Sequence, residues 1–215
     1  AASFLPRVDA IGGSSAGIYL DNRVLVASLF RAVPPAVFTR QVKGLFLRIQ
    51  EDWGVPLVVI NDGEVTALAG AMSLGDGALL GVAMGSSEAA GYVTGDGQIT
   101  SWLNELAFAP VDYQPEAPVD EWSGDRGCGV QYFSQEAVIR LAARAGLDLP
   151  PATPAEKLRA AQESLAGGDE RARLIFETIG CYLGYTIAHY ADFYDLRHLL
   201  ILGRVTSGQG GRIIL

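Results

Sequence analysis

Asn61 and Asp62 are the first residues in this sequence whose types and position suggest chemistry, because they directly follow the apolar run 57–60. Three of those four apolar residues are β-branched, which predicts a strand buried on both faces. Ligands of open α/β sheets bind where strands end, so this order places a carboxylate where a substrate could sit. Aspartate is also a favoured N-cap, and a helical pattern follows at 64–72. Position alone leaves both roles open for Asp62.

A glycine and two serines, Gly85, Ser86 and Ser87, separate two strand-like runs at 78–84 and 88–94. This arrangement predicts a β-hairpin with a small, polar tip. Such a tip exposes backbone N–H groups that could cradle a phosphate, although an ordinary tight hairpin explains the same residues. The Gly/Ser turn at 12–17 lacks the spacing and the lysine of a phosphate loop, so we interpret it as a structural or substrate loop.

Strand-like and helical patterns alternate along the chain, which indicates an α/β fold. Ser134 and Thr153 are expected N-caps, and Gly146 is expected to end a helix. The longest helix has a bulky face and a small face, and we expect both to be buried. The Gly-rich stretch 207–211 is expected to be mobile, and 212–215 is strand-like. The predicted strands cover 8–14, 24–29, 57–60, 78–84, 88–94 and 199–202, and the predicted helices cover 36–52, 64–72, 134–145, 153–165 and 169–194.

Composition excludes several classes of protein. The chain has 215 residues, 49% hydrophobic and 19% charged, enough for a sizeable core in one large domain or two small ones. A net charge of −8 without a Lys/Arg cluster argues against a nucleic-acid partner. No apolar run reaches the roughly 18 residues of a membrane helix, and no secretory signal is visible, so we expect no membrane partner. Two distant cysteines, Cys128 and Cys181, favour a reducing, cytoplasmic location over a disulfide framework.

A collinear set of features spans nearly the whole chain, and together they resemble the ROK family of bacterial sugar kinases and sugar-responsive repressors. The features are a strand ending in Asn-Asp, a glycine-tipped hairpin, a glutamate in a loop, a turn-rich Gly-Cys knot at 124–129, a long helix and a strand ending in glycine. The resemblance implies a ribonuclease H-like ATPase (actin/hexokinase-like) α/β fold with two lobes around a cleft. Residues 1–75 would be the remainder of the N-terminal lobe, and 76–215 the C-terminal lobe.

The resemblance also implies roles for single residues. Asp62 matches the family's general base, which takes the proton from a sugar hydroxyl as that hydroxyl attacks the γ-phosphate of ATP. The expected cofactors are ATP and Mg²⁺, the expected ligand is a small-molecule sugar, and the expected assembly is a homo-oligomer such as a dimer. The other implied contacts are Asn61 and Glu105 to the sugar, and Gly85, Ser86, Ser87 and Gly203 to the nucleotide.

Several positions depart from the family pattern. The family's Glu-x-Gly-His motif matches 105–108, but Phe108 stands where the histidine would be. In the family's cysteine knot only Cys128 is kept, and Val130 replaces a sugar-binding glutamate. Because these side chains cannot make the family's polar contacts, we expect no structural zinc. Glu88, just after the hairpin tip, is expected to bring negative charge toward a polyphosphate.

Three hypotheses follow. The chain is a sugar kinase with an altered pocket, a catalytically degenerate sugar-binding or regulatory protein, or a purely structural or oligomeric relative. A repressor would need a DNA-binding segment before residue 1. The family's Asp-x-Gly-Gly-Thr phosphate hairpin has no counterpart in the sequence and would also precede residue 1.

Overall fold

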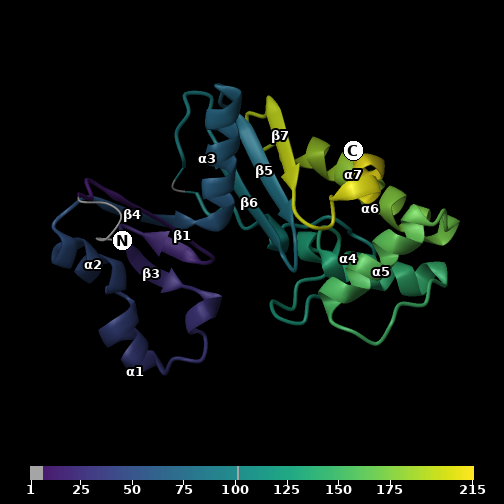
Figure 1. The fold of residues 1–215 in the computed structure, drawn as a ribbon, viewed down its shortest axis with the longest axis horizontal. Coiled ribbons are helices and arrows are strands. Elements are labelled where there is room, and N and C mark those ends of the chain that lie inside the picture. The colour runs from purple at the N-terminus through teal and green to yellow at the C-terminus, as the bar shows by residue number, and fades with distance from the viewer. Residues whose placement is uncertain (1–6, 101) are drawn as a thin grey trace. The chain divides into compact units, whose positions relative to one another are not determined.

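The computed structural model describes residues 7–100 and 102–215 (Figure 1). Contacts divide the chain into two compact units, Ala1–Thr66 and Ala67–Leu215, which we call unit 1 and unit 2. The division falls inside one helix, α3 (Asp62–Leu74), whose first residues belong to unit 1. The lobe boundary expected after residue 75 stays a prediction. No described helix is both long and apolar enough to span a lipid bilayer.

Unit 1 contains two small sheets and several short helices. One buried cluster of unit 1 contains Val24, Ala27 and Val42. β1 pairs in parallel with β4, and β2 forms a hairpin with β3. The elements, in chain order, are β1 (Ile11–Ser15), β2 (Ile18–Leu20), β3 (Arg23–Val26), the 3-10 helix η1 (Ser28–Phe30), α1 (Pro35–Val37), the π-helical turn η2 (Phe38–Val42), α2 (Leu45–Trp53) and β4 (Leu57–Asn61).

β4 is covered on one face only, so the prediction that both of its faces are buried is wrong. Leu57 and Val59 are each 4% exposed, whereas Val58 is 58% exposed. The strand lies in a two-stranded sheet, and Asn22 holds its other edge. The Asn22 Nδ2 donates to Leu57 O at 2.7 Å, and the Asn22 Oδ1 accepts from the Val59 N–H at 2.9 Å. These contacts fix the strand that delivers Asn61.

Unit 2 is organised around a sheet with the strand order β6-β5-β7. β5 (Leu79–Met84) and β6 (Glu88–Val93) form the predicted antiparallel hairpin. β7 (His198–Leu202) joins β5 in parallel, with Ala83 opposite Leu202. The carboxyl ends of β5 and β7 therefore leave the sheet at the same edge.

Helices cover both faces of this sheet (Figure 1). On one face α3 packs so closely that a Cβ added at Gly81 would lie 3.3 Å from Ala67. On the other face, Leu80, Val82 and Met84 of β5 share the main core with the later helices. Those helices are α4 (Gln135–Ala145), α5 (Pro154–Ala166), α6 (Glu170–Tyr190) and α7 (Gly208–Ile214).

The predicted helix boundaries that rest on local capping signals are confirmed. The Ser134 Oγ accepts the Glu136 N–H at 3.2 Å and caps α4, and Gly146 ends that helix in the left-handed region with φ 69°. Thr153 and Glu156 form a reciprocal capping box at the start of α5. Each signal involves residues within one turn, so it can be recognised without tertiary information.

α7 contradicts the prediction of a mobile stretch at 207–211 and a strand at 212–215. Residues 208–214 are helical and pack directly on α6. A Cβ added at Gly180 would lie 2.8 Å from the Ile214 carbonyl oxygen, so glycine is what allows this approach. The helix therefore depends on a tertiary contact that its own glycine-rich sequence does not suggest.

The small face of α6 is only partly covered, which also differs from the prediction. Ile175 and Leu183, on the bulky face, are 1% and 3% exposed. Gly180 contacts α7, but a Cβ added at Gly184 would meet no atom within 4 Å among the described residues. The second half of the small face thus lies at the surface of the described chain.

A pair of adjacent substitutions tests this orientation of α6. Ile175→Ala should lower the free energy of unfolding by about 2–5 kcal/mol, because it leaves a cavity in the main core. Leu174→Ala, at a residue that is 55% exposed, should change it by less than about 0.5 kcal/mol. Urea denaturation followed by circular dichroism measures both. Equal losses from the two variants would contradict the orientation.

Candidate functional site

Asn61 links three segments at the end of β4. Its Nδ2 donates to the Gly17 carbonyl at 2.9 Å, just after β1, and its Oδ1 accepts the Gly63 N–H at 2.8 Å. The second bond is the one an N-cap side chain makes with the first turn of a helix. Asn61 therefore positions the loop after β1 against the start of α3. Its amide retains one N–H and one acceptor lone pair for a ligand.

Asp62 is the first residue of α3 and is half-buried. No described residue donates a hydrogen bond to its carboxylate; its own backbone carbonyl accepts the Thr66 hydroxyl at 2.9 Å. Asn61, not Asp62, makes the hydrogen bond that caps α3. Of the two roles considered for Asp62, that of helix cap is therefore taken by its neighbour. The carboxylate is stabilised by the positive end of the helix dipole and is available to a ligand.

Gly85, Ser86 and Ser87, which we call the hairpin tip, lie at the carboxyl edge of the unit 2 sheet. The Gly85 N–H donates to the Ser87 carbonyl at 2.9 Å and closes the turn. The Gly85 carbonyl accepts the Gln135 N–H at 2.9 Å, which fastens the tip to the first turn of α4. Ser86 and Ser87 are exposed, so the tip presents hydroxyl groups to solvent.

Gly203 meets the hairpin at that same edge. It has φ 108°, and a Cβ there would lie 2.3 Å from the Met84 carbonyl oxygen and 2.7 Å from the Met84 nitrogen. Only glycine fits this conformation and this backbone approach. The Val205 N–H also donates to the Met84 carbonyl at 3.2 Å. The structure thus brings together the four residues predicted on the nucleotide side, all of them within unit 2.

Glu105 lies elsewhere in unit 2, as the N-cap residue of the 3-10 helix η3 (Leu106–Phe108), and is half-buried. A second 3-10 helix, η4 (Gly129–Gln131), packs beside η3, and the Gly129 N–H donates to the Ala109 carbonyl at 2.9 Å. Glu105 is therefore held between β6 and the Gly-Cys knot. Asn61 and Asp62 belong to unit 1.

Glu88 does not point its charge at the hairpin tip, in contrast to the expectation from sequence. It is 4% exposed, and neither carboxylate oxygen has a hydrogen-bond partner among the described residues. A Cβ added at Gly129 would lie 2.2 Å from its Oε2, so the side chain fills the space beside η4. Burial raises the pKa of Glu88 to about 8. The carboxyl is then mostly neutral at pH 7 and does not repel a phosphate.

Ring packing and burial characterise the surroundings of the Gly-Cys knot. Phe108, at the position of the family's histidine, contacts the exposed Trp122 ring with 5.2 Å between centroids. Cys128 is 1% exposed, and burial, together with Asp120 and Asp125, raises the pKa of its thiol. A cysteine binds zinc as the thiolate, which a raised pKa disfavours. The donor set does not fit zinc.

A tyrosine pair that the sequence did not single out anchors the long loop before the knot. Asp112 accepts the Tyr132 hydroxyl at 2.6 Å and the Tyr182 hydroxyl at 3.2 Å. The two rings lie 4.4 Å apart, and Arg140 stacks over Tyr132 at 5.1 Å. Although burial opposes it, these hydroxyls lower the pKa of Asp112. Asp112 falls in an aperiodic loop, so no sequence pattern signals its partners.

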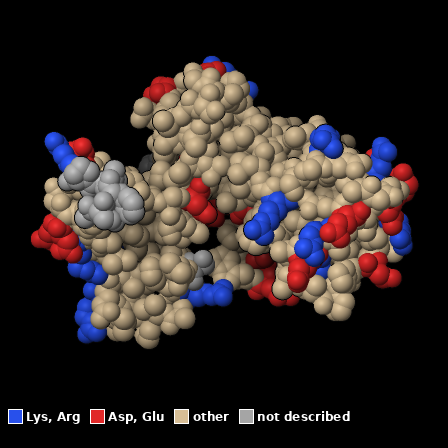
Figure 2. Space-filling view, viewed as in Figure 1, with Lys and Arg blue, Asp and Glu red and all other residues tan. Residues whose placement is uncertain are grey.

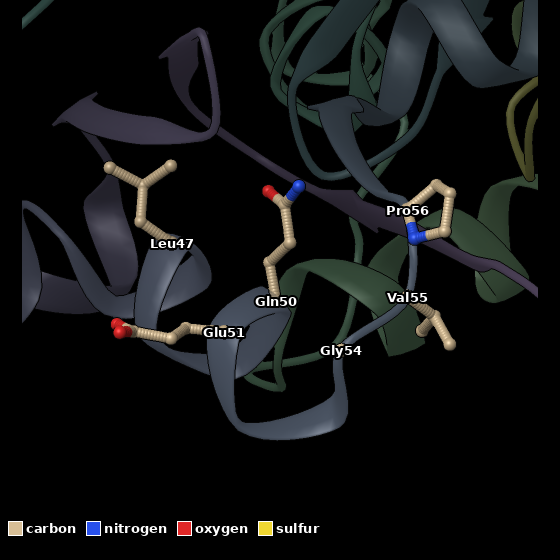
Figure 3. Close-up of a pocket in the computed structure, with 6 residues that line it drawn as sticks. All are labelled: Leu47, Gln50, Glu51, Gly54, Val55 and Pro56. Carbon is tan, nitrogen blue, oxygen red and sulfur yellow. The ribbon is translucent and has the colours of Figure 1, made fainter.

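The described surface of unit 2 has no patch of a single charge in Figure 2, and unit 1 has a depression away from Asn61. Figure 2 shows basic and acidic side chains interspersed over the helices of unit 2 on this face. In unit 1 a depression of about 560 Å³ lies at the end of α2 (Figure 3). It is at the amino end of β4, whereas Asn61 is at the carboxyl end. Its lining residues are Leu47, Gln50, Glu51, Gly54, Val55 and Pro56.

The buried Glu88 predicts a specific dependence of stability on pH. Its pKa is about 8 in the folded chain against 4.5 for the free side chain, so the folded state favours the protonated form. The stabilisation is complete below pH 4.5 and is lost as the pH rises toward 8. Between those values this group should lower the free energy of unfolding by about 1.4 kcal/mol per pH unit.

Glu88→Gln should remove this slope, whereas Glu163→Gln, at an exposed glutamate of α5, should leave it unchanged. Urea denaturation of the three proteins across this pH range measures the effect. The account of Glu88 would be contradicted if the wild type and Glu88→Gln lost stability in parallel.

The knot gives a second prediction, on metal content. Elemental analysis of the purified chain should find far less than one zinc per chain, because Cys128 is buried and Phe108 cannot coordinate a metal. Unfolding should be insensitive to chelators for the same reason. One zinc per chain, removable with loss of stability, would overturn this reading of the knot.

Comparison with known proteins identifies the fold. A ROK hexokinase from Thermus thermophilus superposes with a TM-score of 0.73 and 20% identity, over 95% of this chain and 66% of that one. A ROK transcriptional regulator, a homologue of the E. coli MLC protein, superposes with a TM-score of 0.71 and 22% identity, over 93% of this chain and 51% of that one. A ROK glucokinase from Streptomyces griseus, in complex with glucose and AMPPNP, superposes with a TM-score of 0.66 and 19% identity, over 93% of this chain and 67% of that one.

No protein-family model and no curated protein sequence matches the chain. The chain spans about half to two thirds of the length of these three solved proteins. At this level of identity the likeness concerns the fold, which accounts for the order β4–α3, the hairpin, the long helix and β7. The chain has the mixed α/β fold of the ROK sugar kinases and regulators.

Proposed function

We propose that the chain is part of a divergent ROK-family sugar kinase, which transfers the γ-phosphate of ATP to a sugar hydroxyl. The observation that carries the proposal is the Asp62 carboxylate at the end of β4. It is half-buried, it lies at a helix N-terminus, and no described residue hydrogen-bonds to it. Similar solved structures include a hexokinase and a glucokinase, which supports this choice of reaction.

In this reaction Asp62 accepts the proton of the sugar hydroxyl while the hydroxyl oxygen attacks the γ-phosphorus. The bond from the γ-phosphorus to the bridging oxygen breaks, and ADP leaves. Asn61 orients the start of α3 and uses its remaining N–H toward the sugar, and Glu105 accepts a hydrogen bond from a sugar hydroxyl. The two lobes around a cleft, as in hexokinases, are part of this proposal.

The hairpin tip and Gly203 would face the phosphates of ATP. The exposed serines can donate hydrogen bonds to phosphate oxygens, and the buried, neutral Glu88 removes an obstacle to anion binding. When bound, Mg²⁺ neutralises phosphate charge, and it is usually held by phosphate oxygens, water and one or two carboxylates. No group of three or more His, Cys, Asp or Glu side chains gathers among the described residues.

A second function, a sugar-binding regulator without catalysis, is favoured by a specific observation. Phe108 and Val130 put apolar side chains on η3 and η4, where the family resemblance places a histidine and a glutamate. Loss of those polar contacts would weaken the positioning of a sugar for phosphoryl transfer. One of the similar solved structures is a ROK transcriptional regulator.

Asp62→Asn distinguishes the two functions. If the chain is a kinase, ADP release in a coupled assay should depend on one of a set of hexoses, amino sugars or acylated amino sugars. Asp62→Asn should then lower kcat by about 10²–10⁴-fold, because the base is lost while the shape is kept. Asp52→Asn, at an exposed aspartate of α2, is the matched control and should leave kcat unchanged.

Two outcomes would contradict the kinase. The first is turnover that Asp62→Asn leaves intact. The second is no turnover with any sugar, together with a rise in Tm when one of the sugars is added; this result would establish the regulator instead.

A further inference from the structure

Arg204 occupies the turn that leaves β7, at the edge where the hairpin tip lies. β7 and β5 run in parallel with Leu202 opposite Ala83, and the next residue, Gly203, packs its backbone on Met84. The Val205 N–H donates to the Met84 carbonyl at 3.2 Å, so the residues on both sides of Arg204 contact Met84, which directly precedes the tip. Only glycine fits at position 203, because its backbone lies directly against Met84. This close contact restricts where the backbone of the next residue, Arg204, can lie.

The backbone of Arg204 is fixed, whereas its side chain is free. Its carbonyl accepts hydrogen bonds from the Gln162 Nε2 at 2.9 Å, the Ser207 Oγ at 2.7 Å and the Ser207 N–H at 3.3 Å. The guanidinium is exposed and forms no ion pair or hydrogen bond with any described residue. Because the backbone is already ordered, binding a ligand costs the rotamer entropy of the side chain but no further backbone entropy.

The hairpin tip supplies no positive charge of its own. Its groups are neutral hydroxyl and backbone donors, and the exposed Glu136 lies in the first turn of α4, next to the Gln135 N–H that binds Gly85. The whole chain carries a net charge of −8. A polyphosphate at this edge therefore needs a cationic side chain, and a guanidinium can donate two parallel hydrogen bonds to phosphate oxygens.

We propose that Arg204 is a phosphate-binding residue, which holds the polyphosphate of a nucleotide at the carboxyl edge of the unit 2 sheet together with the hairpin tip. That the polyphosphate belongs to a nucleotide rests on the proposed function. That Arg204 binds a polyphosphate is argued from its position and its charge alone. It adds a residue to which the family resemblance assigns no role.

Calorimetric titration of the whole chain tests the inference. The ligands are Mg·ATP, inorganic tripolyphosphate and adenosine, and the proteins are wild type, Arg204→Ala, Arg204→Lys and Arg144→Ala. Arg144 is the matched control, because it is exposed in the last turn of α4 and lies nine residues, roughly 13.5 Å, along that helix from Gln135, which binds the tip. Thermal melts of all variants check that they fold.

Arg204→Ala should weaken binding of Mg·ATP and of tripolyphosphate about 10- to 100-fold, the range of a charge-assisted hydrogen bond. Arg204→Lys should lie between wild type and Arg204→Ala, because it keeps the charge but not the two parallel donors. Adenosine binding should not change in any variant, and Arg144→Ala should behave as wild type.

The inference is overturned if Arg204→Ala and Arg144→Ala bind tripolyphosphate equally, or if the wild type does not bind it at all. If Arg204→Ala releases ADP in a sugar-dependent way with the wild-type kcat and KM for ATP, the proposed role of Arg204 is wrong, whereas the proposed kinase activity is supported. Arg204-dependent binding of tripolyphosphate without any sugar turnover would support Arg204 and overturn the kinase.

Discussion

The contact on which unit 2 depends is the approach of the Gly203 backbone to Met84, where two parallel strands leave their sheet. Parallel pairing alone brings β5 and β7 to one edge, but a side chain at Gly203 would collide with the Met84 carbonyl. Because the turn after β7 packs against the end of β5, that turn and the first turn of α4 both make backbone hydrogen bonds at the start of the hairpin turn, to Met84 and to Gly85. A substitution at Gly203 would therefore disturb the whole edge rather than a single contact.

The interior near this edge contains a buried carboxyl group, that of Glu88, and a loop held by ring packing and hydrogen bonds. Glu88 buries a carboxyl group without a hydrogen-bond partner, which the folded chain tolerates by keeping it protonated. The neighbouring knot is stabilised by the ring contact between Phe108 and Trp122 and by hydrogen bonds, such as that from Arg126 to the Ala117 carbonyl at 2.9 Å. Ring packing and hydrogen bonds thus connect the residues of this loop in the described chain.

Local signals predicted much of the fold and less of the site. The cap at Ser134 was predictable because its partner is two residues away, whereas α7 depends on the contact of Ile214 with the distant Gly180. The burial of Glu88 could have been recognised, since it shares a strand face with Ala90 and Tyr92 at a spacing of two. The proximity of Gly203 and the hairpin tip depends on strand order, which periodicity does not encode.

Chemical-shift mapping of backbone amides during titration with Mg·ATP is the most direct test of the central claim that a nucleotide binds at this edge. The account predicts the largest shifts at the hairpin tip, Gly203 and Arg204, and further shifts at Asp62 once a phosphate-accepting sugar is added. Shifts confined to the depression at the end of α2 (Figure 3), or no shifts at the edge of the unit 2 sheet, would contradict it.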